Sequence, residues 1–294
     1  MKHSPSLREK RGESISDGEF AFTRHEFEII ARTLHDETGI RLAAGKESLV
    51  YSRLAKRIRA LGLESFQDYC TLVGTAAGAD ERAQMIAALT TNVTRFFRED
   101  HHFRHLKERL LPLLLSGVRT GKRIRIWSAG CSSGQEPYSI ALTILSLLPD
   151  ARSHDIRILA TDINPYVLEV ARKGQYSAED IADVPAELRR TWMEPAGGKA
   201  YRFDDAVRNL VNFRELNLME PWPMRGTFDA IFCRNVVIYF DEQTQAKMWN
   251  RMTGLLTDGG VLYVGHSERV NGPAQGLLSL EATTTYRKPA RGAQ

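Results

Sequence analysis

The stretch that decides the fold is Ile124-Arg-Ile-Trp-Ser-Ala-Gly-Cys-Ser-Ser-Gly-Gln-Glu-Pro137, in which a short apolar strand runs into a turn rich in glycine and serine. It predicts a helix that begins at Glu136-Pro137, where proline suits the first helical position because its missing N–H would have no partner there. An open α/β sheet presents backbone N–H groups to a nucleotide-like ligand at such a turn. At Gly130 and Gly134 a side chain would most obstruct the close approach of that ligand.

A second strand, Ile156 to Asp162, ends in a carboxylate. An acid at the tip of the second strand is placed to accept hydrogen bonds from both hydroxyls of a ribose. The glycines do not follow the pattern Gly-x-Gly-x-x-Gly, so we expect a mononucleoside such as S-adenosylmethionine rather than a dinucleotide. Asp162 could instead cap the helix that starts near Asn164, but its place at a strand end after a glycine turn favours the ribose interpretation.

The composition is that of a soluble globular enzyme, with 294 residues of which 43% are hydrophobic and 26% charged. The length suggests about two domains. Three scattered cysteines, Cys70, Cys131 and Cys233, argue against a disulfide framework and favour a reducing cytoplasm. We expect no signal peptide and no membrane insertion, because the longest apolar run, Leu110 to Leu115, is far shorter than a membrane span. The net charge of +4 permits an acidic partner without choosing among nucleic acid, membrane and protein.

Residues 1–19 are polar and charged without periodicity, which predicts a disordered tail. Residues 20–90 then predict a small helical domain. Its first helix starts at a capping box formed by Thr23 and Glu26 and ends at Gly39.

A second helix, from about Lys46 to Leu61, carries a basic face beside its apolar stripe, made of Lys46, Arg53, Lys56 and Arg57. Long basic side chains can lie along such a face while their charges stay in water. The same face would suit an acidic partner as a docking surface. The residues alone do not decide between these two interpretations.

Residues 91–290 predict an α/β domain in which strands and helices alternate. The alternation is interrupted over residues 176–216, where we expect an inserted helix and a small antiparallel β lobe: a helix over Ala178–Met193 and strands over Lys199–Phe203 and Ala206–Arg214. It resumes with a strand over Phe228–Cys233, a helix over Glu242–Leu256, and strands over Gly260–Val264 and Thr283–Arg287.

Loops at the carboxyl ends of parallel strands meet at one edge of the sheet, which is the usual ligand crevice. We expect five segments there: Asn92–Arg98, Gly130–Glu136, Asp162, Asn217-Leu218 and Phe228–Tyr239.

Methyl transfer from a sulfonium needs alignment and a suitable electrostatic environment more than covalent help. A carboxylate acceptor needs no general base, because glutamate ionises near pH 4.3. Arg98 and Tyr239 could hold such a carboxylate, Arg98 through its charged guanidinium and Tyr239 through its neutral hydroxyl. The Asn-Pro-Pro-Tyr motif of enzymes that methylate amines on nucleic acids is replaced here by Cys233-Arg-Asn-Val-Val-Ile-Tyr-Phe240.

Several of these residues also have plainer interpretations. Glu136 could stabilise the first turn of its helix, an alternative as good as a ligand contact on the residues alone. Asn92 and Thr94 could form a cap or a turn, and Tyr239 could be a core aromatic residue.

A metal site is not expected. His101 and His105 have the spacing of a helical metal pair, but the sequence offers no evident third ligand. Cys131 lies in the ligand turn without the histidine and acid that would activate a nucleophile, so we interpret it as a small turn residue.

Four motifs in order resemble the CheR family of chemotaxis-receptor methyltransferases: Thr91–Glu99, Trp127–Ser139, Cys233–Phe240 and Gly265–Glu268. The resemblance covers about residues 22–288. It implies a Rossmann-like S-adenosylmethionine-dependent methyltransferase sheet with an N-terminal all-helical domain. It also implies esterification of glutamate side chains on the cytoplasmic helices of chemoreceptors, with S-adenosylhomocysteine as the second product.

The resemblance carries the family's cofactor contacts onto nine residues here, namely Asn92, Thr94, Arg98, Glu136, Asp162, Asn217, Leu218, Arg234 and Asn235. Tyr239 matches the family tyrosine that meets the substrate glutamate. In the family the basic helix faces the acidic methylation region of the receptor, which favours docking for the basic face described above.

Some family members also bind a pentapeptide at the receptor's C-terminus by adding it as a strand to the antiparallel lobe. The segment Glu194–Ala200 looks shorter here than in those members, so we expect weak binding of such a peptide or none.

Two other classes of protein compete with this interpretation. A nucleic-acid methyltransferase would grip phosphate with its basic helix, but no aromatic residues cluster beside that helix for stacking on bases. A non-catalytic signalling module is disfavoured because Arg98, Asp162 and Tyr239 are all present.

Overall fold

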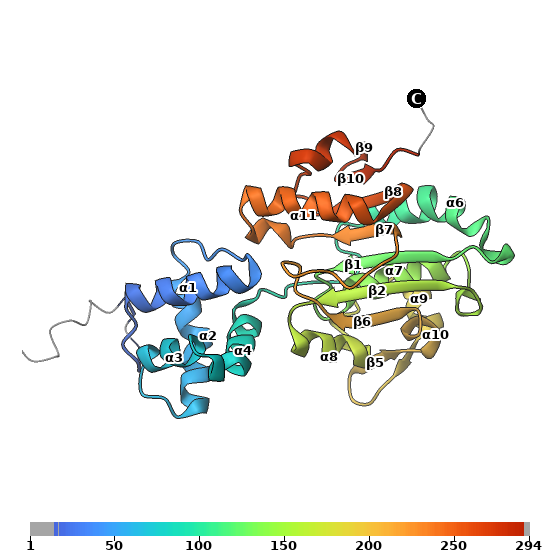
Figure 1. Ribbon diagram of the computed structural model, residues 1–294. Helices are drawn as coiled ribbons and strands as arrows, with labels where there is room; N and C mark the ends of the chain where they lie inside the picture. Colours follow the sequence, from blue (N-terminus) through green and yellow to red (C-terminus); the bar gives the residue numbers. More distant parts are fainter. Residues whose placement is uncertain (1–14, 17, 291–294) are drawn as a thin grey trace, which may run out of the picture. The chain divides into compact units, whose positions relative to one another are not determined.

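The computed structural model of the chain describes residues 15, 16 and 18–290, so most of the predicted disordered tail lies outside the described residues. The chain divides into two compact units, Met1–Thr91 and Asn92–Gln294 (Figure 1).

The first unit is helical, as predicted, and its helices are α1 (Arg24–Thr38), α2 (Glu47–Leu61), α3 (Phe66–Val73) and α4 (Ala79–Leu89), with the short 3-10 helix η2 (Ala76–Gly78) before α4. The capping box at the start of α1 is confirmed, because the side chain of Thr23 accepts from the N–H of Glu26 and Glu26 Oε2 accepts from the N–H of Thr23. Gly39 ends α1 in the left-handed conformation, with φ of 73°.

The core of this unit is aromatic at its centre. The rings of Phe22 and Phe66 lie 4.3 Å apart between centroids, and Tyr51 packs 5.5 Å from Phe66. Leu54 and Ile58 present the apolar face of α2 to this core and are fully buried. On the basic face of α2, Lys46 and Lys56 are exposed, while Arg53 and Arg57 are half-buried.

The second unit is built on a seven-stranded sheet in the order β6-β2-β1-β7-β8-β10-β9. The strands are β1 (Ile124–Ala129), β2 (Ile156–Asp162), β6 (Val211–Glu215), β7 (Phe228–Cys233), β8 (Leu256–Val264), β9 (Ser279–Ala282) and β10 (Thr285–Arg287). The five strands from β6 to β8 run parallel, while β10 and β9 complete the sheet antiparallel. The predicted α/β class with a mostly parallel sheet is confirmed.

Helices cover both faces of the sheet, with α11 in front of β8 and α7 behind β1 and β2 in the view of Figure 1. Those of the second unit are α5 (His101–His105), α6 (Leu111–Leu115), α7 (Gln135–Leu145), α8 (Pro165–Lys173), α9 (Ala186–Trp192), α10 (Asp205–Arg208) and α11 (Glu242–Leu255). A π-helical turn, η3 (Leu106–Leu110), links α5 to α6, and the short 3-10 helices are η4 (Val118–Thr120), η5 (Ala151–Ser153), η6 (Val237–Tyr239) and η7 (Gly272–Gly276).

The order of the strands reverses beside β1. From β1 the chain moves outward through β2 to β6, then returns to the other side of β1 as β7 and continues to β8. Such a reversal opens a crevice outside the carboxyl ends of the strands. The edge that carries Gly130, Asp162 and Arg234 is therefore the edge predicted to bind the ligand.

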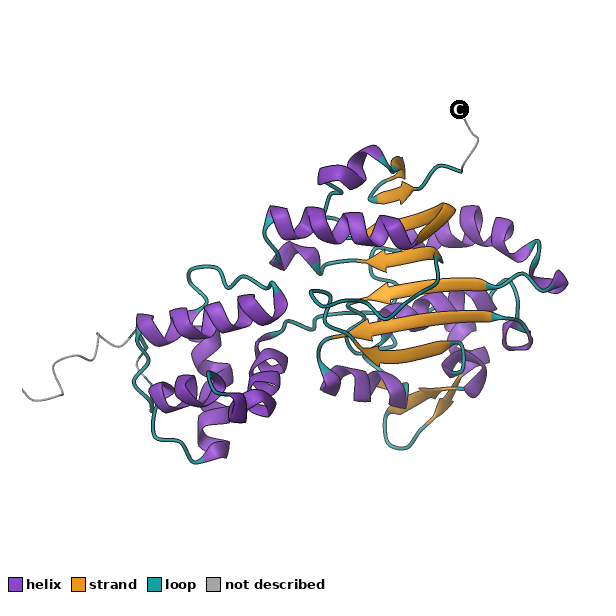
Figure 2. Cartoon of the chain, viewed as in Figure 1, coloured by secondary structure: helices purple, strands orange, loops and turns teal. Residues whose placement is uncertain are grey.

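A separate antiparallel sheet forms the predicted lobe, in the order β3-β5-β4 from β3 (Gln175–Ser177), β4 (Met193–Pro195) and β5 (Ala200–Phe203). These strands are drawn as the short arrows beyond β6 in Figure 2.

The predicted helix over Ala178–Met193 is wrong in its first half, because residues 178–184 form turns and only Ala186–Trp192 is helical. A reciprocal capping pair between Ser177 and Asp180 starts a single turn, and the proline at position 185 prevents the turn from continuing as a helix.

The predicted strand over Ala206–Arg214 is also wrong at its start and in its assignment. The side chain of Asp204 accepts from the N–H of Val207 and caps the short helix α10. The extended segment that follows, β6, pairs with β2 in the main sheet, so the antiparallel lobe ends at Phe203 and not at residue 216.

Candidate functional site

The glycine turn after β1 is held to the end of β2. The N–H groups of Gly130 and Cys131 both donate to the carbonyl of Thr161, at 2.8 and 2.9 Å. Helix α7 begins at Gln135, so Pro137 lies third in the helix and not first as predicted. Its missing N–H still falls in the first turn, where main-chain donors have no helical partner.

The two glycines of this turn are required by packing within the protein. Gly130 has φ of 74°, and a Cβ there would lie 2.3 Å from Cγ2 of Val236. Gly134 has φ of 96°, and its Cβ would lie 2.8 Å from the hydroxyl of Tyr176. Both backbone conformations favour glycine, so the turn keeps its shape independently of any ligand.

Asp162, at the end of β2, holds the glycine turn by hydrogen bonds. Its Oδ2 accepts from the N–H of Ser132 at 2.8 Å, and its Oδ1 accepts from the N–H of Asn164 at 2.9 Å. The cap of α8 is the side chain of Asn164, which accepts from the N–H of Tyr166, so the capping alternative for Asp162 is wrong. Burial raises the pKa of Asp162, while these backbone hydrogen bonds oppose the rise.

Arg234 lies at the centre of a buried ion network at the end of β7. Its Nη1 lies 3.3 Å from Oε2 of Glu136, on α7, and its Nη2 lies 3.6 Å from Oε2 of Glu99. Ser128 donates to the other oxygen of Glu136 at 2.6 Å. Burial raises the pKa of Glu136, and the nearby guanidinium opposes that rise.

The segment Asn92–Glu99 is bonded to the glycine turn and to the loop after β7. Ser132 Oγ donates to the carbonyl of Asn92 at 2.9 Å. Arg234 Nη2 donates to the carbonyl of Arg98, whose own Nη1 donates to the carbonyl of Val93 at 3.0 Å. Thr94 is half-buried within the same segment. The first unit ends at Thr91, so this segment belongs to the second unit.

The segment after β6 joins the same edge. The N–H of Leu216 donates to the carbonyl of Asp162 at 3.0 Å, which places Asn217 immediately beyond the tip of β2. The buried Leu218 accepts from Trp222 Nε1 at 3.1 Å and from Arg251 Nη1 at 2.7 Å. All five segments that the sequence predicted to converge are thus brought together by strand pairing and hydrogen bonds.

The segment after β7 carries Arg234, Asn235 and Tyr239. Tyr239 is half-buried and ends the short helix η6. The backbone of this segment is held by Glu268. In the sequence this residue was noted only as part of the motif Gly265–Glu268, and no role was predicted for it. No local pattern marks its role, because its partners lie about thirty positions earlier in the chain.

Backbone strain concentrates at this edge. Four of the five non-glycine residues with positive φ in the described part of the chain lie in these segments: Phe97, Glu99, Ser132 and Asn235, with φ between 50° and 59°. Such conformations cost about 1–3 kcal/mol each and cluster at functional sites, where the surrounding structure holds them. Here the hydrogen bonds of Asp162, Arg234 and Glu268 hold them.

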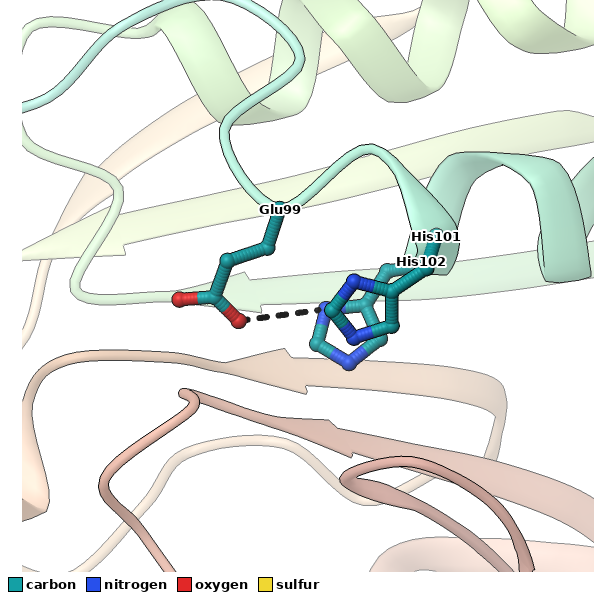
Figure 3. A group of neighbouring side chains, drawn as sticks. All are labelled: Glu99, His101 and His102. Atoms are coloured by element: carbon teal, nitrogen blue, oxygen red, sulfur yellow. Dashed lines mark ion pairs between the residues drawn. The ribbon is translucent and has the colours of Figure 1, made fainter.

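The histidines near this edge do not form the i, i+4 pair that was considered for a metal. His105 Nδ1 faces the hydroxyl of Tyr263 at 3.0 Å. Instead Glu99, His101 and His102 gather, with ligand atoms within 4.8 Å of one another (Figure 3). A metal ion there would lie beside the guanidinium of Arg234. This guanidinium already neutralises Glu99, and its positive charge would repel the metal ion. The absence of a metal stays a prediction.

The basic face of α2 is only partly free to meet a partner. Arg53 Nη1 donates to the carbonyls of Ala88 and Thr90 at the end of α4, at 3.0 and 2.8 Å. Arg57 forms a two-point ion pair with Glu81, which also accepts from Tyr69. Lys46 and Lys56 are exposed.

The donors and acceptors at the sheet edge fit a nucleoside that carries an amino acid group. A carboxylate accepts about four hydrogen bonds, so Asp162 can accept from ribose beyond the bonds that it receives from backbone N–H groups. A guanidinium has five N–H donors, so Arg98 can hold a carboxylate while it bonds to Val93. The glycine turn leaves Ser132 in a left-handed conformation, with its N–H bonded to Asp162.

A mostly parallel sheet with this crevice and these residues defines an S-adenosylmethionine-dependent methyltransferase. Residues 92–286 match the family model described as CheR methyltransferase, SAM binding domain, and residues 25–90 match CheR methyltransferase, all-alpha domain. The chain therefore belongs to the CheR methyltransferase family. The predicted family, cofactor and reaction type are confirmed.

Curated relatives match over most of their length. A protein of Rhizobium etli described as "Probable chemotaxis protein methyltransferase" is 53% identical over 262 residues, covering 88% of this chain and 98% of the relative. Chemotaxis protein methyltransferase 2 of Pseudomonas aeruginosa is 43% identical, with coverages of 85% and 88%. The chemotaxis protein methyltransferase of Escherichia coli K12 is 40% identical, with coverages of 90% and 91%. Within residues 15, 16 and 18–290, no helix combines the length and apolar character that a membrane crossing requires.

Proposed function

We propose that the protein transfers the methyl group of S-adenosylmethionine to glutamate side chains of chemoreceptors, forming methyl esters. The observation that carries this proposal is the bond from Arg234 to the carbonyl of Arg98, which joins the segment of Arg98 to the segment of Tyr239 at the cofactor edge. The family match and the chemotaxis relatives support the acceptor class.

The bound cofactor supplies a methyl group that is already activated on a sulfonium. A glutamate acceptor is ionised near neutral pH, so the protein has no proton to remove before transfer. In this proposal the guanidinium of Arg98 and the hydroxyl of Tyr239 hold the acceptor carboxylate in line with the methyl group. Both act by positioning and by electrostatic complementarity, in one direct displacement without a covalent intermediate.

The remaining residues at the edge hold the cofactor in this proposal. Asp162 accepts from the ribose hydroxyls, next to the glycine turn that includes Gly130. Glu136, bonded to Ser128 at the end of β1, is a further proposed contact. The other proposed contacts come from the loops that converge here, namely Asn92, Thr94, Arg98, Asn217, Leu218, Arg234 and Asn235.

The receptor would be recognised in part by the basic face of α2. The acidic methylation helices of the receptor complement the charges of the exposed Lys46 and Lys56. Arg53 and Arg57 have partners inside the first unit, so they chiefly hold α2 against α4. Their contribution to receptor binding is limited to the charge that these partners leave unneutralised. In this proposal the enzyme acts on the cytoplasmic region of the receptor, with protein and not nucleic acid as its substrate.

The test uses tritiated S-adenosylmethionine with receptor-rich membranes in one reaction and with nucleic acid in a parallel one. We expect label on receptor protein that is released as methanol by mild base, because methyl esters hydrolyse there. Label that resists base, or label only on nucleic acid, would overturn the proposal. Tyr239→Phe and Arg98→Ala should reduce the base-labile label.

A further inference from the structure

Glu268 lies in the turn after β8, and only 3% of the residue is exposed. Its carboxylate accepts five backbone N–H bonds. Oε1 accepts from Val236, Val237 and Ile238 at 2.9, 2.9 and 3.3 Å, and Oε2 accepts from Asn235 and Gly265 at 2.9 and 2.6 Å.

Four of these donors form the short backbone segment 235–238 that separates Arg234 from Tyr239. Asn235 has φ of 59°, and the 3-10 helix η6 starts two residues later. N–H groups at such a start have no main-chain acceptor. Converging N–H groups of this kind form a concave site for an anion, and here the carboxylate of Glu268 occupies it.

The carboxylate of Glu268 packs closely against Gly265 and Asn235. Strands β7 and β8 are neighbours, with Cys233 opposite Val264, so the turn at Gly265 follows directly beside Arg234. A Cβ on Gly265 would lie 2.7 Å from Glu268 Oε2 and 2.7 Å from Asn235 Nδ2. The side chain of Glu268, which follows β8, therefore holds the backbone that follows β7.

We propose that Glu268 is a positioning residue for methyl transfer, which holds segment 235–238 so that Arg234 and Asn235 face the cofactor and Tyr239 faces the acceptor. The role toward Tyr239 rests on the proposed function, while the role toward Arg234 and Asn235 concerns cofactor binding alone. Glu268 itself acts through these residues and takes no part in the chemistry.

The amide in Glu268→Gln has one acceptor oxygen, and its NH₂ group would meet backbone donors. At least two of the five bonds would be lost, and the backbone of Asn235 or Val236 would move. We expect the dissociation constant for S-adenosylhomocysteine to rise by about tenfold or more, and kcat to fall by about tenfold or more.

Asp229→Asn is the matched control. Asp229 lies at the opposite end of β7, and its Oδ2 also accepts a backbone N–H, that of Arg125, at 2.8 Å. The substitution makes the same change from acid to amide on the same strand, away from the crevice. We expect it to lower thermal stability while the affinity for S-adenosylhomocysteine and kcat per binding-competent molecule stay within about twofold.

Calorimetric titration separates positioning from a merely structural role. Loss of folded protein would lower the number of binding sites and leave the dissociation constant of the remaining sites unchanged. A positioning role raises that constant at full stoichiometry and raises the KM for cofactor. Wild-type affinity and kcat in folded Glu268→Gln would overturn the proposal.

Gly265→Ala decides the question if Glu268→Gln does not fold. Its added methyl would push on the carboxylate and on Asn235, the first residue that the carboxylate holds, and it keeps the charge. It should therefore weaken S-adenosylhomocysteine binding, and unchanged binding would refute the proposal. Because binding of S-adenosylhomocysteine requires no acceptor, this result stands even if the wild-type enzyme proves to methylate something other than glutamate.

Discussion

Arg234 and Glu136 stand 98 positions apart in the chain and form a buried ion pair, with Nη1 3.3 Å from Oε2. The side chain of Arg234 is only 2% exposed and that of Glu136 14% exposed. Glu99 lies on the other side of the same guanidinium at 3.6 Å. One cation thus neutralises two carboxylates from different segments, and the removal of that cation has consequences for both.

Arg234→Met should destabilise the protein by about 3–5 kcal/mol, because it leaves Glu136 and Glu99 buried without a cation. Adding Glu136→Gln should cost less than the sum of the two single changes, with a coupling of about 1–3 kcal/mol. Urea unfolding of the two single variants and the double variant measures this cycle. Strict additivity would show that the pair is not coupled.

Asp162→Ala should weaken S-adenosylhomocysteine binding by about 1.5–3 kcal/mol if Asp162 accepts a charge-assisted bond from the ribose. It should also lower stability, because Ser132 and Asn164 lose the acceptor of their N–H groups. Calorimetry measures the affinity. The control is Asp155→Ala, which removes an exposed acid beside the other end of β2. An unchanged dissociation constant in Asp162→Ala would reject the ribose assignment.

Lys46→Glu combined with Lys56→Glu should leave cofactor affinity unchanged and lower kcat/KM for receptor, because both exposed charges would then repel an acidic helix. The same charge change at the exposed Lys107 and Lys247, on other elements, is the control. Methylation rates on receptor membranes at low and high salt measure the effect. Equal rates for the two double variants would remove α2 as the docking surface.

Arg57 requires a different experiment, because Arg57→Glu would place two acids together at Glu81. Glu81 is 7% exposed and accepts from both Arg57 and Tyr69. A loss of receptor methylation in such a variant would therefore report the folding of the first unit as much as docking. The two lysines are the cleaner probe.

The stability of the protein should fall as the pH drops below about 6.5. Burial, followed by the charge of Arg234, lowers the pKa of His102 to about 2. An unfolded histidine titrates near 6.5, so between these values the unfolded state binds more protons. The contribution of His102 is present above about pH 6.5, and about 2 kcal/mol of it is lost between pH 7 and pH 5.

Burial also lowers the pKa of His105, which adds to this effect in the same direction. Urea midpoints of the wild type and of His102→Gln at pH 7 and pH 5 measure the share of His102. Parallel pH dependences in the two proteins would contradict a neutral buried His102.

The receptor's C-terminal pentapeptide should bind weakly or not at all. Both edge strands of the antiparallel lobe, β3 and β4, are three residues long, which limits the main-chain bonds that an added strand can make. The connection from β4 to β5 is a tight turn at Gly197-Gly198. Calorimetric titration with the peptide tests this prediction. Clear saturation at micromolar concentration would show that the lobe does tether the receptor.

The sequence predicted the glycine turn and the strand that ends at Asp162 because its signals there are local. The apolar run before Gly130, the acid at the end of β2 and the capping box at Thr23 each lie within one turn or strand. Fold class, strand ends and the converging edge followed from these signals.

Other features depend on partners that are distant in the chain. The pairing of β6 with β2 is a contact between segments about fifty residues apart, so its alternating pattern did not distinguish the main sheet from the lobe. The five bonds of Glu268 and the ion network of Arg234 also join separate strand ends. Asp204, in contrast, was a local capping signal that would have predicted α10.

The left-handed residues Phe97, Glu99, Ser132 and Asn235 lie in loops whose hydrogen bonds are internal to the protein, so these loops have their shape before any cofactor arrives. Binding of the cofactor then orders few additional residues, so little binding free energy is lost to the ordering of loops. The cofactor should therefore occupy the site at low concentration. By linkage, saturating S-adenosylhomocysteine should raise the melting temperature of the second unit, and mutations that loosen these loops should reduce that rise.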